Sequence, residues 1–269
     1  MRMTTNIRNK DRVFYTDLNG LQMLKRKFFG KIPLQGNVYP MPSAAYVEDT
    51  NHRLSILSGQ PSGVSNLENG VIDIFLDRRL LQDDNRGLNQ GVMDNKITPD
   101  IFKLVLEPIK RPNPNPSSKI GQLSLLAHLS SLNLLHPLFT LHRKEILQQR
   151  ALLSSMSVLN GNFPCDTHLV NLKILEDVQK YGEGGVGPKR EQALILHRMS
   201  VDCRSSISVE LACNATDGKI PIYSLFSELN VERAEETSLT LMYNKGDLPV
   251  GQSAFLEPMD IKTFKIKLT

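Results

Sequence analysis

The densest group of residues able to do chemistry is the charged segment DRRLLQDDNRG at residues 77–87. Guanidinium groups beside carboxylates are suited to holding a polyol, because sugar hydroxyls both donate and accept hydrogen bonds. Asp83 and Asp84 do not fit a retaining glycosidase, whose two carboxyl groups flank the scissile bond about 5 Å apart, since adjacent residues of an extended chain project to opposite sides. The segment therefore indicates either a sugar-contacting loop or a solvated charged turn.

Other kinds of chemistry find little support in the residue spacing. None of the six histidines stands at metal-ligand spacing from another histidine, a cysteine or a glutamate, so no zinc site is expected in this chain. His168 and His197 border apolar runs and are interpreted as strand-end residues rather than ligands. The glycine-rich stretch at residues 182–187 lacks the Gly-Lys-Ser/Thr ending of a phosphate loop and is interpreted as a surface loop. No serine lies in a nucleophile-elbow pattern.

Composition excludes several classes of protein. Of the 269 residues, 40% are hydrophobic and 22% are charged, which is typical of a globular fold. Basic residues are interleaved with acidic ones, so the net charge of +4 does not indicate a nucleic-acid surface. No apolar run approaches the roughly 18 residues of a membrane span, and the polar amino-terminal stretch is unlike a signal peptide.

Three cysteines leave the compartment open. Cys165, Cys203 and Cys213 fit either free thiols or one bridge plus a spare. Asn214 begins an Asn-Ala-Thr glycosylation triplet, which has a meaning only if the chain reaches the secretory lumen. By composition alone, a chance triplet is favoured.

Most of the chain is predicted to form short strands with period-two alternation between turn signals. Asn19-Gly20 suits the positive φ angles of a tight hairpin, and residues 49–51 separate a second pair of strands. In the closing segment, Phe264, Ile266 and Leu268 are expected to point inward, while Thr263, Lys265 and Lys267 face water. The expected fold class is therefore all-β, an antiparallel β-sandwich region with an irregular proline-rich insert.

Three ranges are expected along the chain. Residues 1–107 form a first strand-rich part and residues 161–269 a second. Between them, residues 108–160 begin with four prolines, which favour an extended linker or surface loop. Within this insert, residues 123–135 are leucine-rich and predict one short helix that ends before Pro137.

The charged segment, extended as DRRLLQDDNRGLNQGVMDNK, closely resembles a segment of the Golgi-type class II α-mannosidases, glycoside hydrolase family 38. Further segments resemble that family in the same order. They are RVFYTDLNG (residues 12–20), IPLQGNVYPMP (32–42), RLSILSGQPSGVSNL (53–67), PCDTHLVNL (164–172), ALILHR (193–198) and EPMDIKTFKIKL (257–268). The resemblance covers nearly the whole chain except the proline-rich insert and the glycine-rich stretch.

The resemblance implies an enzyme of the Golgi membrane, facing the lumen, that trims α-linked mannose from N-linked glycans with retention. It implies that an amino-terminal domain carries the zinc ion, the aspartate nucleophile and the acid, and that this chain matches only the β-rich carboxyl-terminal region. Zinc is then expected in the full-length enzyme and no cofactor in this chain. The first residues look like the middle of a strand, so Met1 is expected to be an internal methionine.

Residue roles follow from the same resemblance. It places Arg86 at the edge of the sugar pocket as a substrate-binding residue, with Arg78, Asp83 and Asp84 positioning its loop. It implies a disulfide between Cys203 and Cys213, which suits an oxidising lumen. Glycosylation of Asn214 then becomes an expectation, and Cys165 is either free or paired outside this chain.

Two functions from different classes result. In the first, the chain supports a catalytic domain, contributes Arg86 and is inactive alone, with an N-glycan or mannoside as the enzyme's substrate. A truncated gene product is a variant of this hypothesis. In the second, the chain is a free-standing mannose-binding β-sandwich, a lectin. The sequence leaves open whether the chain is monomeric or a homodimer.

Overall fold

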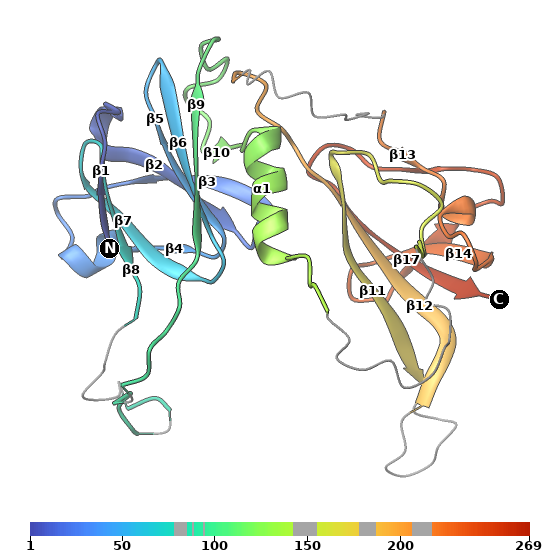
Figure 1. Cartoon of the computed structure of the whole chain (residues 1–269). Coiled ribbons are helices and arrows are strands. Elements are labelled where there is room, and N and C mark those ends of the chain that lie inside the picture. Colours follow the sequence, from blue (N-terminus) through green and yellow to red (C-terminus); the bar gives the residue numbers. More distant parts are fainter. Residues whose placement is uncertain (78–84, 88, 94, 142–154, 178–186, 206–216) are drawn as a thin grey trace. The chain divides into compact units, whose positions relative to one another are not determined.

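The computed structural model describes residues 1–77, 85–87, 89–93, 95–141, 155–177, 187–205 and 217–269 (Figure 1). The chain divides into two compact units. The first consists of Met1–Phe139 and Val201–Ser208, and the second of Thr140–Ser200 and Val209–Thr269. The chain therefore leaves the first unit, enters the second, returns briefly to the first and ends in the second.

The first unit contains a six-stranded and a four-stranded sheet, and all neighbouring strands pair antiparallel. The larger sheet has the order β10-β3-β2-β5-β6-β9 and the smaller has the order β1-β8-β7-β4. The strands are β1 (Arg2–Thr4), β2 (Val13–Leu18), β3 (Gln22–Lys27), β4 (Tyr39–Met41), β5 (Ala44–Glu48), β6 (His52–Ser58), β7 (Ser62–Glu68), β8 (Val71–Phe75), β9 (Phe102–Pro108) and β10 (Ile120–Gly121), with short 3-10 turns at Lys10–Arg12 and Leu34–Asn37.

The predicted hairpins are confirmed. Asn19 and Gly20 have φ angles of 51° and 73°, the positive values that allow β2 to turn tightly into β3. Asp17, which is 1% exposed, fixes this corner by accepting hydrogen bonds from the backbone of Gly20 and of Ser43 and from the Ser43 hydroxyl. Asp49 caps the turn between β5 and β6 in the same way. The local turn chemistry thus sets the pairing of both hairpins.

Two apolar clusters hold the first unit together. One draws on both sheets and contains Phe14 and Ile56 from the larger sheet and Val64 and Ile72 from the smaller. The other joins the larger sheet to helix α1 (Leu125–Leu135), which packs against β6 and β9.

Helix α1 confirms the helix predicted inside the insert. Ser124 caps its amino terminus by accepting a hydrogen bond of 3.1 Å from the backbone of Ala127, and its hydroxyl donates to the buried Glu107 carboxylate at 2.7 Å. Because α1 belongs to the first unit, the compact units do not follow the three expected ranges. The described part of the chain holds no helix with the length and apolarity needed to cross a membrane.

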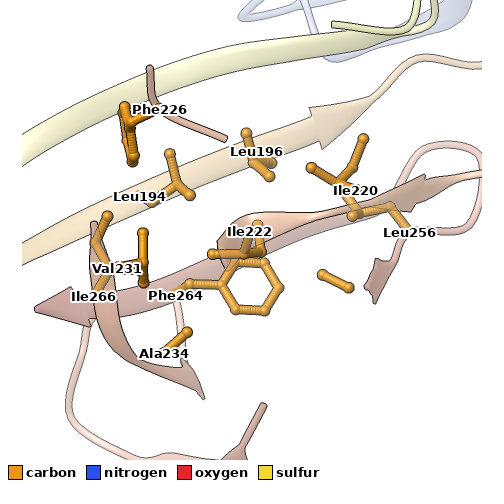
Figure 2. Packing of buried hydrophobic residues seen from close by; sticks show 11 residues of the cluster. Leu194, Leu196, Ile220, Ile222, Phe226, Val231, Ala234, Leu256, Phe264 and Ile266 are labelled. Carbon is orange, nitrogen blue, oxygen red and sulfur yellow. The ribbon is translucent and has the colours of Figure 1, made fainter. Parts of the chain in front are cut away.

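The second unit is built on a five-stranded antiparallel sheet of order β11-β12-β17-β14-β15 and a small two-stranded sheet. Figure 2 shows side chains of β12, β14 and β17 gathered in one apolar cluster with Ile220, Ile222 and Leu256. The elements are β11 (Thr167–Asp177), β12 (Gly187–Arg198), β13 (Lys219–Ile220), β14 (Val231–Thr237), β15 (Asn244–Asp247), β16 (Ala254–Phe255), β17 (Ile261–Leu268) and a 3-10 turn at Ile222–Ser224.

The expected all-β class is confirmed, with one correction in β17. Phe264 and Ile266 are buried as predicted, whereas Thr263, expected to face water, is 1% exposed. Thr263 pairs with Ile195 on one side and Thr237 on the other, in the middle of the sheet. Period-two alternation gives the two faces of a strand but does not say whether the outer face is covered.

Candidate functional site

Arg86 lies on the long connection between β8 and β9, and its side chain is exposed. The connection starts from a firmly held strand, because Ile72 and Ile74 of β8 are only 1% and 2% exposed. Asn85, directly before Arg86, has a φ of 62°, the left-handed conformation that asparagine tolerates well. The residues proposed to position this loop, Arg78, Asp83 and Asp84, lie outside the described residues.

A groove of about 1140 Å³ lies where this connection leaves β8. Phe75, Leu76 and Asp77 line it, and the Phe75 ring is 46% exposed. Arg2 donates to Asp73 through two hydrogen bonds of 2.7 and 3.0 Å across the β1–β8 pair on its wall. An exposed aromatic face next to carboxylates and a guanidinium is an arrangement that can contact both the C–H face and the hydroxyls of a sugar.

A second charged cluster lies inside the first unit. Arg53, which is fully buried, donates from Nη2 to Glu48 at 2.5 Å and to Asp202 at 2.6 Å, and from Nη1 to the backbone of Gln122 at 3.0 Å. Arg204 donates to the same two carboxylates at 2.8 to 3.1 Å. We call Glu48, Arg53, Asp202 and Arg204 the charge quartet.

The members of the charge quartet are held together as ion pairs. Burial raises the pKa of Asp202, but the hydrogen bonds from Arg204 and the charge of Arg53 outweigh it and leave this pKa lowered. Burial likewise lowers the pKa of Arg53, but Tyr46, Glu48 and Asp202 outweigh it and leave this pKa raised. Arg53 and Arg204 both donate to the Glu48 and Asp202 carboxylates, so the charge quartet acts as a structural clamp.

The described residues do not offer a zinc site. No three histidine, cysteine or carboxylate side chains among them converge on one point. His168 and His197 face each other across β11 and β12, near the strand ends as predicted. Burial, followed by the charge of His168, lowers the pKa of His197 to about 4, and Asp260 opposes this shift. The zinc implied by the resemblance therefore has no donor set in the described part of this chain.

The expected disulfide between Cys203 and Cys213 is wrong. Cys203 is an exposed free thiol, its Sγ 3.8 Å from the carbonyl oxygen of Val201, whereas Cys165 is disulfide-bonded. The physical reason is that Cys203 belongs to a segment that returns to the first unit, beside Asp202, rather than to a hairpin. Cys213 and the glycosylation triplet at Asn214 lie outside the described residues.

Sequence reasoning missed the charge quartet. A usable signal was Arg53 itself, a lone charged residue in the apolar strand HRLSILS, where a buried cation requires paired carboxylates. Its partner Asp202 is 149 residues away, which no local pattern can reveal.

The described residues of the first unit thus form two antiparallel sheets over a shared core, with an exposed arginine on the connection between β8 and β9. Residues 1–86 match the family model described as the glycosyl hydrolases family 38 C-terminal domain. The chain belongs to this family and is its C-terminal β-rich region.

Known relatives agree over the full chain. It is 43% identical over 273 residues to α-mannosidase 2 of Mus musculus, 42% over 270 residues to α-mannosidase 2 of Homo sapiens, and 36% over 290 residues to α-mannosidase 2 of Arabidopsis thaliana. These alignments cover 100% of this chain but 23%, 23% and 24% of the relatives. The chain thus spans about a quarter of the length of these proteins.

Proposed function

We propose that this chain is the β-rich region of a retaining α-mannosidase that removes α-linked mannose from N-glycans in the Golgi lumen. In this proposal a separate catalytic domain holds the zinc ion, the nucleophile and the acid. The chain supports that domain and presents Arg86 to the edge of its sugar pocket. The similarity to enzymes named α-mannosidase 2 supports the substrate class.

The position of Arg86 is the observation that carries the proposal. Its side chain is exposed on the connection that follows the buried strand β8, so the guanidinium is accessible to solvent. A guanidinium donates in a fixed fork and stays charged at any physiological pH. It can therefore orient sugar hydroxyls while another part of the enzyme supplies the chemistry.

Exposed apolar side chains support the scaffold role. Leu104 and Leu106 of β9 are 56% and 62% exposed, and Ile101 just before them is 61% exposed. Strand β9 is the last strand of the larger sheet, so it also presents a backbone edge. Exposed apolar edges of this kind favour aggregation unless they are covered, which supports a covering domain.

The decisive experiment places this chain in an active enzyme. The aligned region of mouse α-mannosidase 2 is replaced by residues 1–269, and hydrolysis of an aryl α-mannoside is measured with and without Arg86→Ala. Loss of one charge-assisted hydrogen bond predicts that kcat/KM falls about 10- to 100-fold. Arg190→Ala, at an exposed arginine of β12, is the matched control and should leave kcat/KM unchanged.

The results separate the parts of the proposal. Full activity of the Arg86→Ala chimera would refute the role of Arg86. Measurable hydrolysis by the isolated 269-residue chain, abolished by a zinc chelator, would refute the requirement for a separate catalytic domain.

A free-standing lectin is the second candidate, and the half-exposed Phe75 ring is the observation that favours it, since lectins stack sugars on aromatic faces. Titration of the 269-residue chain with mannose, followed by protein chemical shifts, distinguishes it. Saturable binding that Arg86→Ala weakens would favour the lectin over the scaffold.

A further inference from the structure

A polar cleft lies in the first unit beneath the proline-rich segment that follows β9. It has a volume of about 560 Å³ and adjoins a second cleft of about 800 Å³. Tyr15, Arg111 and Arg204 line both. We call the two together the Arg204 cleft; it shares no lining residue with the groove beside Phe75.

Two tyrosines form one wall of the Arg204 cleft. The rings of Tyr15 and Tyr46 stack with their centroids 4.5 Å apart, and the side chains are 6% and 1% exposed. A Cβ at Gly121 would overlap the Tyr46 hydroxyl and the Tyr15 ring, so glycine lets β10 lie against both. Neither phenol makes a hydrogen bond to another described residue, and both tyrosines line the smaller cleft. A phenol that lines a cleft without a protein partner can donate its hydrogen bond to a ligand or to water in that cleft.

Both hydroxyls are available as donors. Burial is the main cause that raises the pKa of Tyr15, and it raises the pKa of Tyr46 further. The two phenols are therefore protonated at any physiological pH and can donate to an acceptor in the Arg204 cleft.

Two guanidinium groups supply further hydrogen-bond donors beside the two phenols. Arg204 is held by hydrogen bonds from Nε and Nη2 to Glu48 and Asp202, which leaves its Nη1 without a partner among the described residues. Arg111 makes no hydrogen bond or ion pair to the described residues, and its side chain is exposed at the rim. The Glu48 and Asp202 carboxylates of the cleft already accept hydrogen bonds from Arg53 and Arg204. The Arg204 cleft thus has an excess of donors over acceptors.

The net charge of the residues that line the Arg204 cleft also favours an anionic ligand. Six cationic and four carboxylate side chains line the two clefts. The cations are Arg8, Lys10, Lys25, Lys110, Arg111 and Arg204, and the carboxylates are Asp11, Glu48, Asp49 and Asp202. Arg53, which lines neither cleft, also forms ion pairs with Glu48 and Asp202 and so offsets the negative charge of these two carboxylates. A concave surface with this balance concentrates anions.

We propose that the Arg204 cleft binds a small oxyanion, a sulfate or a phosphate monoester, with Tyr46, Tyr15, Arg204 Nη1 and Arg111 as its donors. Tetrahedral oxyanions carry several acceptor oxygens and no apolar face, which matches a wall of donors. The anion can be free or attached to a sugar. This binding goes beyond the proposed mannosidase role and does not depend on it.

The test is calorimetric titration of the 269-residue chain in chloride buffer of low ionic strength. The four probes are sulfate, inorganic phosphate, glucose 6-phosphate and glucose. Saturable binding of one equivalent, with a Kd below about 1 mM, is expected for at least one oxyanion and not for glucose. Glucose 6-phosphate binding more tightly than inorganic phosphate would identify a sugar-borne anion, and equal affinity a free one.

Variants assign the donors. Tyr46→Phe removes one hydroxyl and keeps the ring, and Arg111→Gln removes an exposed charge without touching the core. Each should weaken oxyanion binding about tenfold, the effect of one charge-assisted hydrogen bond. Arg190→Gln is the matched control for net charge and should not change the affinity.

Three results would overturn the proposal. They are no saturable binding of any oxyanion, binding of glucose as tight as that of glucose 6-phosphate, and an equal loss of affinity in Arg190→Gln and Arg111→Gln. If Tyr46→Phe does not fold, as judged by circular dichroism, Arg111→Gln alone decides the outcome.

Discussion

Replacing Arg53 by methionine removes one cation from the charge quartet and keeps most of the side-chain volume. Arg53 is fully buried and donates hydrogen bonds to Glu48, to Asp202 and to the Gln122 backbone. After the change, one guanidinium from Arg204 is left to serve two partly buried carboxylates. The Gln122 carbonyl also loses its donor.

The expected cost follows from these contacts. Removing one partner of a buried ion pair typically destabilises a protein by about 3–5 kcal/mol. Because Arg204 still holds both carboxylates, we expect the lower end, about 3 kcal/mol. With a urea dependence of about 2 kcal/mol per molar, the unfolding midpoint should fall by about 1.5 M.

Urea unfolding followed by circular dichroism measures this midpoint. A double variant, Arg53→Met with Glu48→Met, removes one charge of each sign and leaves the Arg204–Asp202 pair complete. The double variant should therefore be more stable than Arg53→Met alone by at least about 1 kcal/mol, the signature of coupled residues. Arg2→Met, at an exposed ion pair with Asp73, is the matched control and should leave the midpoint unchanged.

Two results would refute this reasoning. If Arg53→Met lowers the free energy of unfolding by less than about 1 kcal/mol, the buried cation contributes no more than a surface ion pair does. A double variant less stable than the single variant would show that the two charges are not coupled.

Two further predictions concern the second unit and the free thiol. Because His197 has a pKa of about 4 in the folded chain, the unfolded chain binds a proton that the folded chain does not between pH of about 6.5 and 4. The free energy of unfolding should therefore fall by up to about 3 kcal/mol as the pH drops through this range, with little contribution above it. His197→Gln should flatten the profile in urea titrations at several pH values, and an unchanged profile would contradict the assignment. In the native oxidised chain, a maleimide should label Cys203 and spare Cys165, which mass spectrometry of a digest checks, and a labelled Cys165 would be the contrary result.

Local features were predictable because their causes are local. Asn19-Gly20 predicted a hairpin because these residue types adopt positive φ angles easily, and the structure has those angles. The leucine-rich segment predicted α1, which the Ser124 cap begins. In both cases a few adjacent residues determine the outcome.

Long-range features could not be predicted from the sequence, because their causes are not local. The family resemblance implied a bridge between Cys203 and Cys213, but Asp202 donates from its backbone to Leu123, and Ser205 pairs with Ile109. These contacts hold Cys203 in the first unit. Pairings between segments 80 to 150 residues apart depend on packing that a single sequence does not display.

The return of residues 201–205 to the first unit has a consequence for biosynthesis. A chain emerging from the ribosome can pair β1 to β10 early, but Arg53 remains without Asp202 and Arg204 until the whole of β11 and β12 has been made. The first unit is therefore completed only after much of the second has been translated. Folding of the two units is interleaved along the chain, so no single cut in the polypeptide yields two complete units.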